Sequence, residues 1–379
     1  MKKWKVFVRF AVLSSALLMV SGCSGGNTKK AAEKKSTAAE SSKVELSVEG
    51  GTYIIPDGEK VEDSSGFLAL DIKVKNKSDD KLDISPEDFA LYDEEGNKVS
   101  SERVYDSNDK FKVMSYESVS QDKSFTAPLV FEVDKEAEYE LHYKPTYYSE
   151  DEKDEGIELK LNAKKYSDET KEVEALVEQY ISTVFYGDEE KKEDTEKDEE
   201  KKDEKEPKVE LANDLEKEKQ EFKEGSIELL KEDFSRYEPS SAEVEKVITE
   251  IQTTNREKAK VTYAFKEFFP ETATIYVRPE VILLEKVDTE AIMETFVEEN
   301  KGKYSDYSSV YRDAEKYLLQ ELPTKIKEAA IATESNMDGE GYQVKLEKKD
   351  GKWEVHSENE SRNYDFNSMR STFRGGLDD

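Results

Sequence analysis

Cysteine and histidine are nearly missing from this sequence, and each shortage excludes a kind of site. The chain of 379 residues has one cysteine and two histidines. One cysteine excludes a disulfide framework and a cysteine-rich zinc site. Two histidines leave little for histidine-based metal binding or base chemistry. We therefore expect neither a metal nor a cofactor.

Basic residues are also in the minority. The chain has 58 of them against 89 acidic residues, so its net charge is −31. This charge repels a phosphate backbone, which excludes nucleic acid as a partner. Hydrophobic residues make up only 35% of the chain, below the usual share of a globular domain, yet 20 Tyr and 16 Phe can still form cores. The length allows roughly two domains.

The first 23 residues have the layout of a bacterial secretion signal. Basic side chains come first, at Lys2, Lys3, Lys5 and Arg9. An apolar stretch of eleven residues, 10–20, follows. It is shorter than the roughly 20 residues that span a bilayer, and it has the length of the apolar region of a signal peptide.

A short motif ends this region: Val20, Ser21, Gly22 and Cys23. It resembles the lipobox of bacterial lipoproteins, with valine where leucine is commoner. The resemblance implies that residues 1–22 are a signal peptide, that the thiol of Cys23 receives diacylglycerol, and that the protein is anchored on the outer face of the cytoplasmic membrane. Two acyl chains hold a protein stably on a membrane. The alternative is an ordinary signal peptide with an incidental cysteine.

Residues 23–42 are predicted to be the lipidated cysteine and a flexible tether. They are rich in Ser, Ala, Gly and Lys and show no apolar periodicity. Removal of residues 1–22 deletes four basic residues and no acidic one, so the net charge changes from −31 to about −35. An anionic membrane surface repels such a chain, so the acidic body should stay away from the lipid.

Residues 43–166 show the alternation that is typical of half-buried strands. Apolar residues recur at every second position in several segments, among them 44–48, 68–74, 129–133 and 157–161. About seven short strands with turn signals between them predict an all-β, immunoglobulin-like sandwich. Pro128 indicates that its strand is an edge strand or carries a bulge.

Several of these strands resemble a known domain. The segments that carry the resemblance are 70–78, 82–84, 88–97 and 129–133. They resemble the telokin-like immunoglobulin-fold domain of Gram-positive lipoproteins, although Ala127 and Pro128 stand where that family often has glycine. The resemblance implies the fold of about a third of the chain and not its function.

Acidic turns and one histidine are the candidate metal ligands in this part. The turns are Asp93–Asn97, Asp79–Asp80 and Asp106–Asp109. None has the ligand spacing of an EF-hand, so we interpret all three as solvated turns rather than calcium loops. His142 lies on an alternating strand with no second histidine nearby, so we interpret it as a solvated histidine.

The periodicity changes after Tyr166. Apolar residues recur at helical spacing over 173–184, with Ser167-Asp168 as the N-cap and an end near Gly187. Residues 188–208 then contain 19 charged residues among 21. Nothing there can form a core, so we expect a disordered or transiently helical insert; the alternative is an interaction tail for a cationic partner.

The remaining residues mix helices and strands. We expect helical segments within 211–234 that are interrupted near Gly225, and a strand at 259–265. We also expect a β-rich stretch at 272–284, which Pro279 breaks or places at an edge. Further predicted elements are a helix from Asp288 to about Asn300, a helical stretch over 304–333 with Pro323 as a kink, and a closing hairpin with Asp350-Gly351 in its turn.

The helix-first, hairpin-last order resembles a second family. Residues 173–188 and 344–355 resemble the cystatin-like cone of the nuclear transport factor two superfamily, in its secreted lipoprotein branch. The resemblance implies an α+β cystatin-like domain over 167–379, and such cones sometimes enclose a pocket. Aromatic side chains could line it or form its core: Trp353, Tyr304, Tyr307, Tyr311 and Tyr317. His356 has no expected partner.

No catalytic pattern is present: no His–Asp pair, nucleophile elbow, phosphate-binding loop or metal-ligand spacing. We therefore expect a non-catalytic, lipid-anchored binding or interaction lipoprotein. Its expected partners are the membrane, through diacylglycerol on Cys23, and an envelope or extracellular protein or a small ligand. The alternative is a binder of small molecules or envelope fragments that uses the cone pocket, with hydrolysis by paired carboxylates. A third hypothesis is a spacer in the cell wall.

Overall fold

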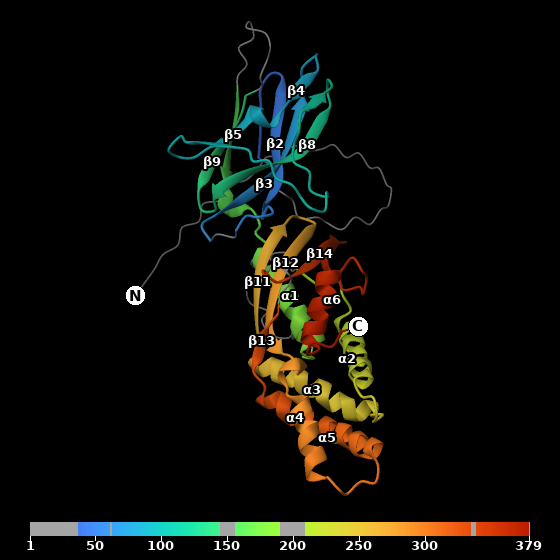
Figure 1. Ribbon diagram of the computed structural model, residues 1–379. Helices are drawn as coiled ribbons and strands as arrows, with labels where there is room; N and C mark the ends of the chain where they lie inside the picture. Colours follow the sequence, from blue (N-terminus) through green and yellow to red (C-terminus); the bar gives the residue numbers. More distant parts are fainter. Residues whose placement is uncertain (1–36, 61–62, 145–155, 190–208, 335–338, 379) are drawn as a thin grey trace, which may run out of the picture. The chain divides into compact units, whose positions relative to one another are not determined.

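The computed structural model (Figure 1) describes residues 37–60, 63–144, 156–189, 209–334 and 339–378. These residues belong to one compact unit, 36–379. The lipobox, most of the predicted tether and residues 190–208 of the charged insert lie outside the described residues.

Residues 37–162 form a β-sandwich of two sheets. The first sheet has the order β1-β2-β3-β8, with strands Thr37–Glu40, Val44–Ile54, Ser65–Asn76 and Ser124–Asp134. The second has the order β10-β9-β5-β6, with strands Ile157–Asn162, Glu138–Tyr143, Phe89–Tyr92 and Lys98–Ser100. A further pair joins β4 (Leu82–Ile84) to β7 (Glu117–Val119), and two 3-10 turns span Pro86–Asp88 and Ala163–Lys165.

The predicted alternation builds the core between these sheets. Leu46, Leu70 and Leu141 are completely buried and belong to one hydrophobic cluster that both sheets share. The prediction for Pro128 is also confirmed, because β8 is the last strand of its sheet. Proline has no backbone N–H to donate to a neighbouring strand, and an edge strand has one side on which no such donor is needed.

The last part of the predicted flexible tether, residues 37–40, is a strand, which corrects the prediction. Residues 37–40 form β1, which pairs antiparallel with β2 through Ala39 and Leu46. Ala39 packs against the sandwich core. The alanine-rich segment has no apolar alternation, so its strand depends on the edge of β2 rather than on its own pattern.

The residues after 166 form an α+β domain around a second sheet. This antiparallel sheet has the order β11-β12-β14-β15, with β13 beside β12; the strands are Lys260–Phe268, Thr272–Ile282, Tyr342–Lys349, Lys352–Val355 and Ile331–Thr333. Helices α1 (Thr170–Tyr180) and α6 (Tyr364–Phe373) share its core through Val173, Met369 and the fully buried Trp353. A π-helical segment, Ile181–Phe185, extends α1.

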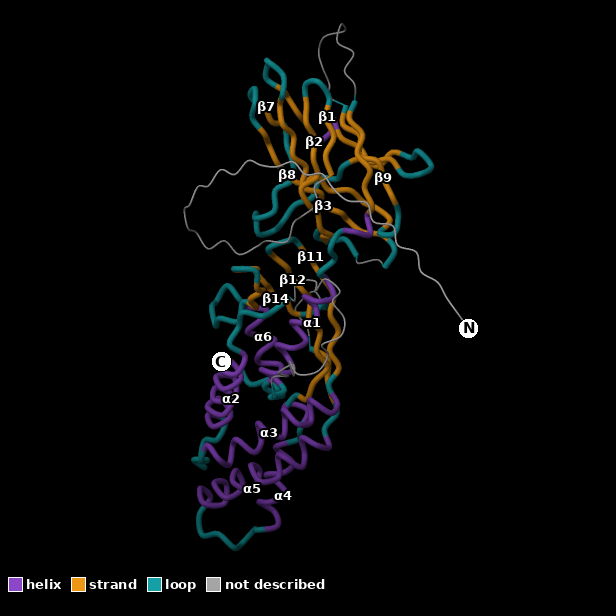
Figure 2. The backbone as a smooth tube through the Cα atoms, turned by 180° about the vertical axis from the view of Figure 1, so that it is seen from behind, coloured by secondary structure: helices purple, strands orange, loops and turns teal. Residues whose placement is uncertain are grey.

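Four further helices form a layer with its own core. They are α2 (Leu215–Glu232), α3 (Ser241–Lys258), α4 (Thr289–Glu299) and α5 (Tyr307–Glu328), and a 3-10 turn spans Leu284–Lys286. Val247, Ile326 and Ile282 are among the buried residues of this core. Figure 2 shows that, apart from short 3-10 turns, helices occur in this second part and not in the sandwich.

The interruption predicted near Gly225 is wrong. Helix α2 continues through this residue from Leu215 to Glu232. Glycine lowers the stability of a helix interior by about 1 kcal/mol relative to alanine, which a packed helix can tolerate. Gly225 leaves room for the guanidinium of Arg374, because a Cβ at this position would lie 2.9 Å from Nη2 of that arginine.

Pro279 neither breaks its strand nor lies on an edge strand, which is a second correction. Strand β12 is continuous and has neighbours on both sides. Its pairing with β14 ends at Val277 and its pairing with β13 begins at Glu280. Pro279 therefore lies at the changeover, where its carbonyl accepts the N–H of Glu334 and no partner requires its missing N–H.

Two helix boundaries and one whole helix also differ from the prediction. Helix α1 has Glu169 as its N-cap, and Asp168 instead accepts hydrogen bonds from Thr170 and pairs with Lys135. The long helical stretch ends at Glu328, beyond Pro323, and 331–333 is a strand. Helix α6 has no counterpart among the predicted elements. The hairpin turn is confirmed, with φ of 51° at Asp350 and 81° at Gly351.

Candidate ligand-binding site

A cavity of about 410 Å³ lies within the α+β domain. Its walls come from the end of α1, one face of α2, one face of α6 and the segment after β15. The volume is in the usual range for small-molecule sites, about 300–1,000 Å³. Aromatic rings and charged groups line it together, including Phe222, Phe366, Glu218, Glu358, Arg370 and Arg374.

Helix α6 contributes two cations to this cavity. Phe366, Arg370 and Arg374 are spaced by four residues, which places them on one helix face. The guanidinium of Arg370 lies 5.5 Å from the ring centre of Phe366 and donates to the carbonyl of Ser357 at 3.0 Å. These contacts fix the position of the guanidinium at the cavity wall.

Arg374 is the more deeply buried of the two arginines. Its side chain is 6% exposed, and its guanidinium carbon lies 5.4 Å from the ring centre of Phe222. Gly225 allows this approach, because any other side chain there would meet the guanidinium. A buried guanidinium at a cavity wall is suited to a carboxylate or phosphate.

An anchored carboxylate lies on α2. Glu218 accepts a hydrogen bond from the hydroxyl of Tyr180 and one from Asn213 Nδ2 at 2.9 Å. Asn213 is itself held by Val355, whose carbonyl it binds at 3.0 Å and whose N–H donates to it at 2.8 Å. Burial and the charge of Glu218 raise the pKa of Tyr180 well above its usual value, so the tyrosine remains a donor.

Replacing Gly225 with alanine should separate helix stability from the position of Arg374. The methyl group would push the flexible end of Arg374 aside, whereas alanine raises helix propensity by about 1 kcal/mol. We expect an unchanged or slightly higher Tm in calorimetry, together with a changed Nε–Hε signal of Arg374 in NMR. A Tm that falls by several degrees would show that the guanidinium cannot move.

A second hollow, of about 550 Å³, lies between α4 and α5. It is an open groove lined by Ala291, Ile292, Tyr317 and Lys325, among others. It lacks the buried arginine and the anchored carboxylate of the first cavity. We therefore treat the cavity between α2 and α6 as the candidate site.

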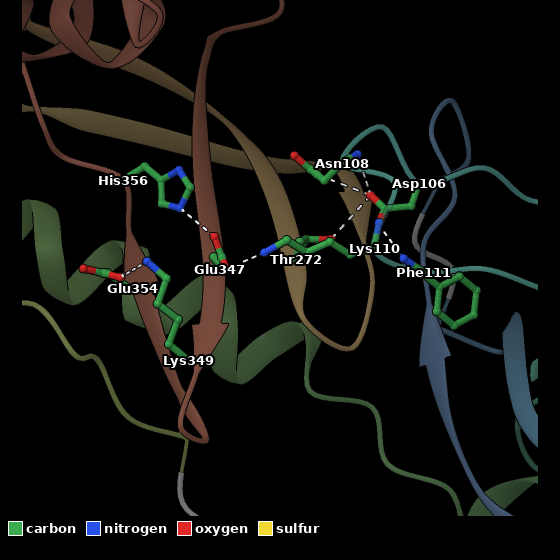
Figure 3. A network of polar contacts seen from close by, with 9 residues as sticks. All are labelled: Asp106, Asn108, Lys110, Phe111, Thr272, Glu347, Lys349, Glu354 and His356. Carbon is green, nitrogen blue, oxygen red and sulfur yellow. Dashed lines mark hydrogen bonds and ion pairs between the residues drawn. The ribbon is translucent and has the colours of Figure 1, made fainter. Parts of the chain in front are cut away.

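A polar network holds the sandwich against the α+β domain (Figure 3). The carboxylate of Asp106 accepts the backbone N–H groups of Asn108, Lys110 and Phe111, each at 2.8 Å, and Thr272 Oγ1 lies 3.5 Å from it. The turn Asp106–Asp109 was interpreted as solvated, but Asp106 is only 9% exposed. This is a correction: the turn is part of an internal contact.

Glu267 is the buried centre of the same contact. It is completely buried on β11 and accepts hydrogen bonds from both the hydroxyl and the N–H of Ser107 on the sandwich side. Asn108 Nδ2 and Thr274 Oγ1 also donate to it, at 3.3 and 3.2 Å. One carboxylate thus satisfies four donors from two parts of the chain.

His356 has a partner, contrary to expectation. Its Nε2 lies 3.5 Å from the carboxylate of Glu347, which also binds the ammonium of Lys110 (Figure 3). The hydrogen bond from Lys110 holds the pKa of Glu347 below its usual value. The pairing of β14 with β15 places Glu347 opposite Glu354, two residues before His356. The hairpin therefore brings together two side chains that are nine positions apart in the sequence.

His142 also has partners, and they are carboxylates. Its ring lies between Glu140, at 3.4 Å from Nε2, and Glu158, at 3.9 Å from Nδ1, and it contacts the ring of Tyr92 at a tilt, with ring centres 4.5 Å apart. The sequence around His142 does not reveal this group, because Glu158 comes from the neighbouring strand. The three residues could hold a metal ion, although exposed acidic groups often cluster without one.

The carboxylates of the other acidic turns accept hydrogen bonds from groups within the sandwich. Asp93 accepts hydrogen bonds from the N–H groups of Glu95 and Asn97 and from Asn97 Nδ2. These bonds hold the pKa of Asp93 below its usual value. The turn at Asp93 therefore has the internal hydrogen bonds of an ordinary Asx turn. Asp79 instead accepts a hydrogen bond from Gln121, which is distant in the sequence, at 3.2 Å.

The predicted aromatic residues are not brought together. Trp353 is completely buried in the core of the α+β domain and lines neither cavity. Tyr307 is 66% exposed and stacks on Tyr311, with ring centres 4.2 Å apart. Tyr304 bonds Asp313, and Tyr317 alone of the four lines the open groove. The core interpretation thus applies to Trp353 and is wrong for the tyrosines.

Among the described residues, no helix is both long enough and apolar enough to cross a membrane. The lipidation site Cys23 and its motif, Val20 to Gly22, lie outside those residues. Their role therefore stays a prediction.

Comparison with known proteins supports the resemblance read from the sequence. Residues 33–153 match the model of a domain of unknown function, DUF4352. The chain is 25% identical over 361 residues to the uncharacterized lipoprotein YcdA of Bacillus subtilis, covering 91% of this chain and 94% of YcdA.

One solved structure agrees with this chain at the level of fold. The crystal structure of the ycdA protein of Bacillus subtilis covers 88% of this chain and 98% of its own, with 18% identity and a TM-score of 0.63. The yjhA protein of Bacillus subtilis covers 33% of this chain and 96% of its own, with 18% identity and a TM-score of only 0.27. The predicted resemblance to Gram-positive lipoproteins is thus confirmed, with a β-sandwich followed by an α+β domain and with YcdA as a homologue.

Proposed function

We propose that this protein is a lipid-anchored lipoprotein on the outer face of the cytoplasmic membrane, where its α+β domain binds a small ligand from the cell envelope. Two observations support the anchor: the homologue YcdA is a lipoprotein, and Cys23 is the single cysteine and ends a lipobox-like motif. Cleavage after Gly22 and a diacylglycerol on Cys23 complete this part of the proposal.

The cavity between α2 and α6 carries the binding part. It is enclosed by elements of one domain, and it presents a buried arginine, an anchored carboxylate and aromatic walls. The lining is more polar than that of an average ligand pocket, with charged and amide side chains around a few aromatic rings, so a charged or strongly polar ligand fits it best. No described arrangement of its side chains matches a nucleophile with a base, so we propose binding rather than catalysis.

The finer fold assignment belongs to the same proposal. The two-sheet arrangement over 43–166 is consistent with a telokin-like immunoglobulin fold, and the helix-then-sheet order over 167–379 is consistent with a cystatin-like cone. Helices α2 to α5 are additions to a minimal cone. Of these helices, α2 supplies a wall of the cavity.

Saturation-transfer NMR on the full-length protein tests the proposal. The probe is a soluble digest of Gram-positive cell wall, made with a muramidase and an amidase. We expect transfer signals from a subset of the components, reduced at least tenfold in Arg374→Met and retained in Arg362→Met, which removes the same charge from an exposed residue outside the cavity. Absence of signals, or signals equal in the two variants, would contradict the proposal.

A further inference from the structure

We infer that the pocket binds a short peptide with both termini free, with its carboxylate at Arg374 and its ammonium group at the carboxylates of Asp214, Glu218 and Glu358. This inference rests on the proposed function and adds the chemical class of the ligand. It follows from where the charges lie along α2 and α6.

The arginine end of the pocket is suited to a carboxylate. Arg374 lies at the C-terminal end of α6, over Phe222 and beside Gly225. Its low exposure means that little water screens its charge, so an arriving carboxylate interacts with it strongly. The planar guanidinium can bind both oxygens of a terminal carboxylate.

Carboxylates predominate at the opposite end, where Lys217 also lines the cavity and pairs with Glu221 at 3.5 Å. Asp214 caps the start of α2, and Glu218 lies one turn further along on the same face. The hydrogen bonds to Glu218 come from Tyr180 and Asn213, which are both neutral donors. Glu358 adds a third carboxylate from the segment after β15. A primary ammonium group fits this surrounding.

The helix geometry sets the length of the ligand. Glu218 and Gly225 are seven residues apart on α2, which corresponds to about 10 Å along the helix axis. An extended peptide spans at most about 3.6 Å per residue, so about three residues reach from one end to the other. A single amino acid, with its two charges on one carbon, is too short to contact both ends.

The walls between the ends fit such a peptide. Phe222 and Phe366 line the cavity from α2 and α6, and the ring of Phe185 contacts both of them. Tyr180 and Phe366 have ring centres 5.9 Å apart. These rings can pack against small apolar side chains. Arg370, held by the carbonyl of Ser357 and by Asn367, has further N–H donors that can bind a peptide carbonyl. The site therefore has a place for each part of an unblocked tripeptide.

Calorimetric titration of the full-length protein in detergent tests this inference. The probes are tri-alanine, N-acetyl-tri-alanine, tri-alanine amide and free alanine. We expect tri-alanine to bind, each blocked form to bind at least tenfold more weakly, and free alanine to show no binding. A ligand-side comparison of this kind does not depend on how a variant folds.

Paired substitutions locate the two ends. Arg374→Met should weaken tri-alanine at least tenfold and leave the weak binding of the amide unchanged, because the amide has already lost that contact. Glu218→Gln should behave in the same way with the N-acetyl form. Gly225→Ala, which keeps the charge and only displaces the guanidinium, should also weaken tri-alanine, and Arg362→Met should not.

The outcomes separate this inference from the proposed function. Equal binding of tri-alanine and its blocked forms, or no binding of tri-alanine while the cell-wall digest still binds, would overturn the peptide assignment alone. Failure of both tri-alanine and the digest would overturn the proposed function as well.

Discussion

Replacing Cys23 with alanine should move the protein from the membrane fraction to the medium. The lipobox-like motif ends at this residue, and the apolar region before it has eleven residues, too few to span a bilayer. The net charge of the mature chain, about −35 after loss of four basic residues, also opposes adsorption to anionic lipid.

Cell fractionation and metabolic labelling with an alkynyl fatty acid measure this prediction. Wild type should be membrane-bound and labelled, whereas the Cys23→Ala variant should be unlabelled and recovered outside the cells. Ser24→Ala is the matched control, because it changes the neighbouring residue and leaves the thiol. A Cys23→Ala protein that remains membrane-bound and labelled would refute lipidation at this residue.

Replacing Glu267 with alanine should cause the largest loss of stability. Its carboxylate is completely buried and satisfies four donors, two of them from Ser107 on the sandwich. Removing it leaves these donors without an acceptor and opens a cavity, at a cost of about 2–5 kcal/mol. For domains of this size, this corresponds to a fall in Tm of roughly 5–15 °C.

Hydrogen exchange identifies the cause of that loss. The amide of Ser107 donates to Glu267 at 3.2 Å, so its exchange should accelerate in Glu267→Ala more than that of strand amides in the sandwich core. Glu271→Ala is the control, since it removes an exposed glutamate from the turn next to β11. If Glu271→Ala and Glu267→Ala lower the Tm equally, the buried network does not hold the two parts together.

The sandwich could be predicted in detail because one physical rule determines it. Half-buried strands need an apolar residue at every second position, and Leu46, Leu70 and Leu141 follow that rule. The alternation rule does not predict a strand whose sequence has no such alternation. Strand β1 is made of small residues, and its pairing with β2 decides its conformation.

The α+β domain was predicted less well, because single glycines and prolines were given more weight than packing. Gly225 and Pro279 usually interrupt helices and strands, yet one lies within α2 and the other within β12. In each case a contact in the folded structure explains why the residue is tolerated. The side chain of Arg374 occupies the space beside Gly225, and Pro279 lies where β12 changes from one partner strand to another. Neither neighbour is close in sequence.

The candidate site could not be predicted for the same reason. Its groups come from α1, α2, α6 and the segment after β15, and α6 itself was not predicted. Among 89 acidic residues, nothing in the sequence distinguishes Glu218 from its neighbours. Only the structure shows that Tyr180 and Asn213 anchor it. The aromatic residues that the sequence did suggest, Trp353 and four tyrosines, lie elsewhere.

The side-chain NMR signals of the arginines test the central claim most directly. With ¹⁵N-labelled arginine in the full-length protein, the cell-wall digest should shift the Nε–Hε signals of Arg374 and Arg370 at the cavity wall. The signal of Arg362, which is exposed and does not line the cavity, should stay in place. Unchanged signals of Arg374 and Arg370, or equal shifts of all three arginines, would contradict a ligand site between α2 and α6.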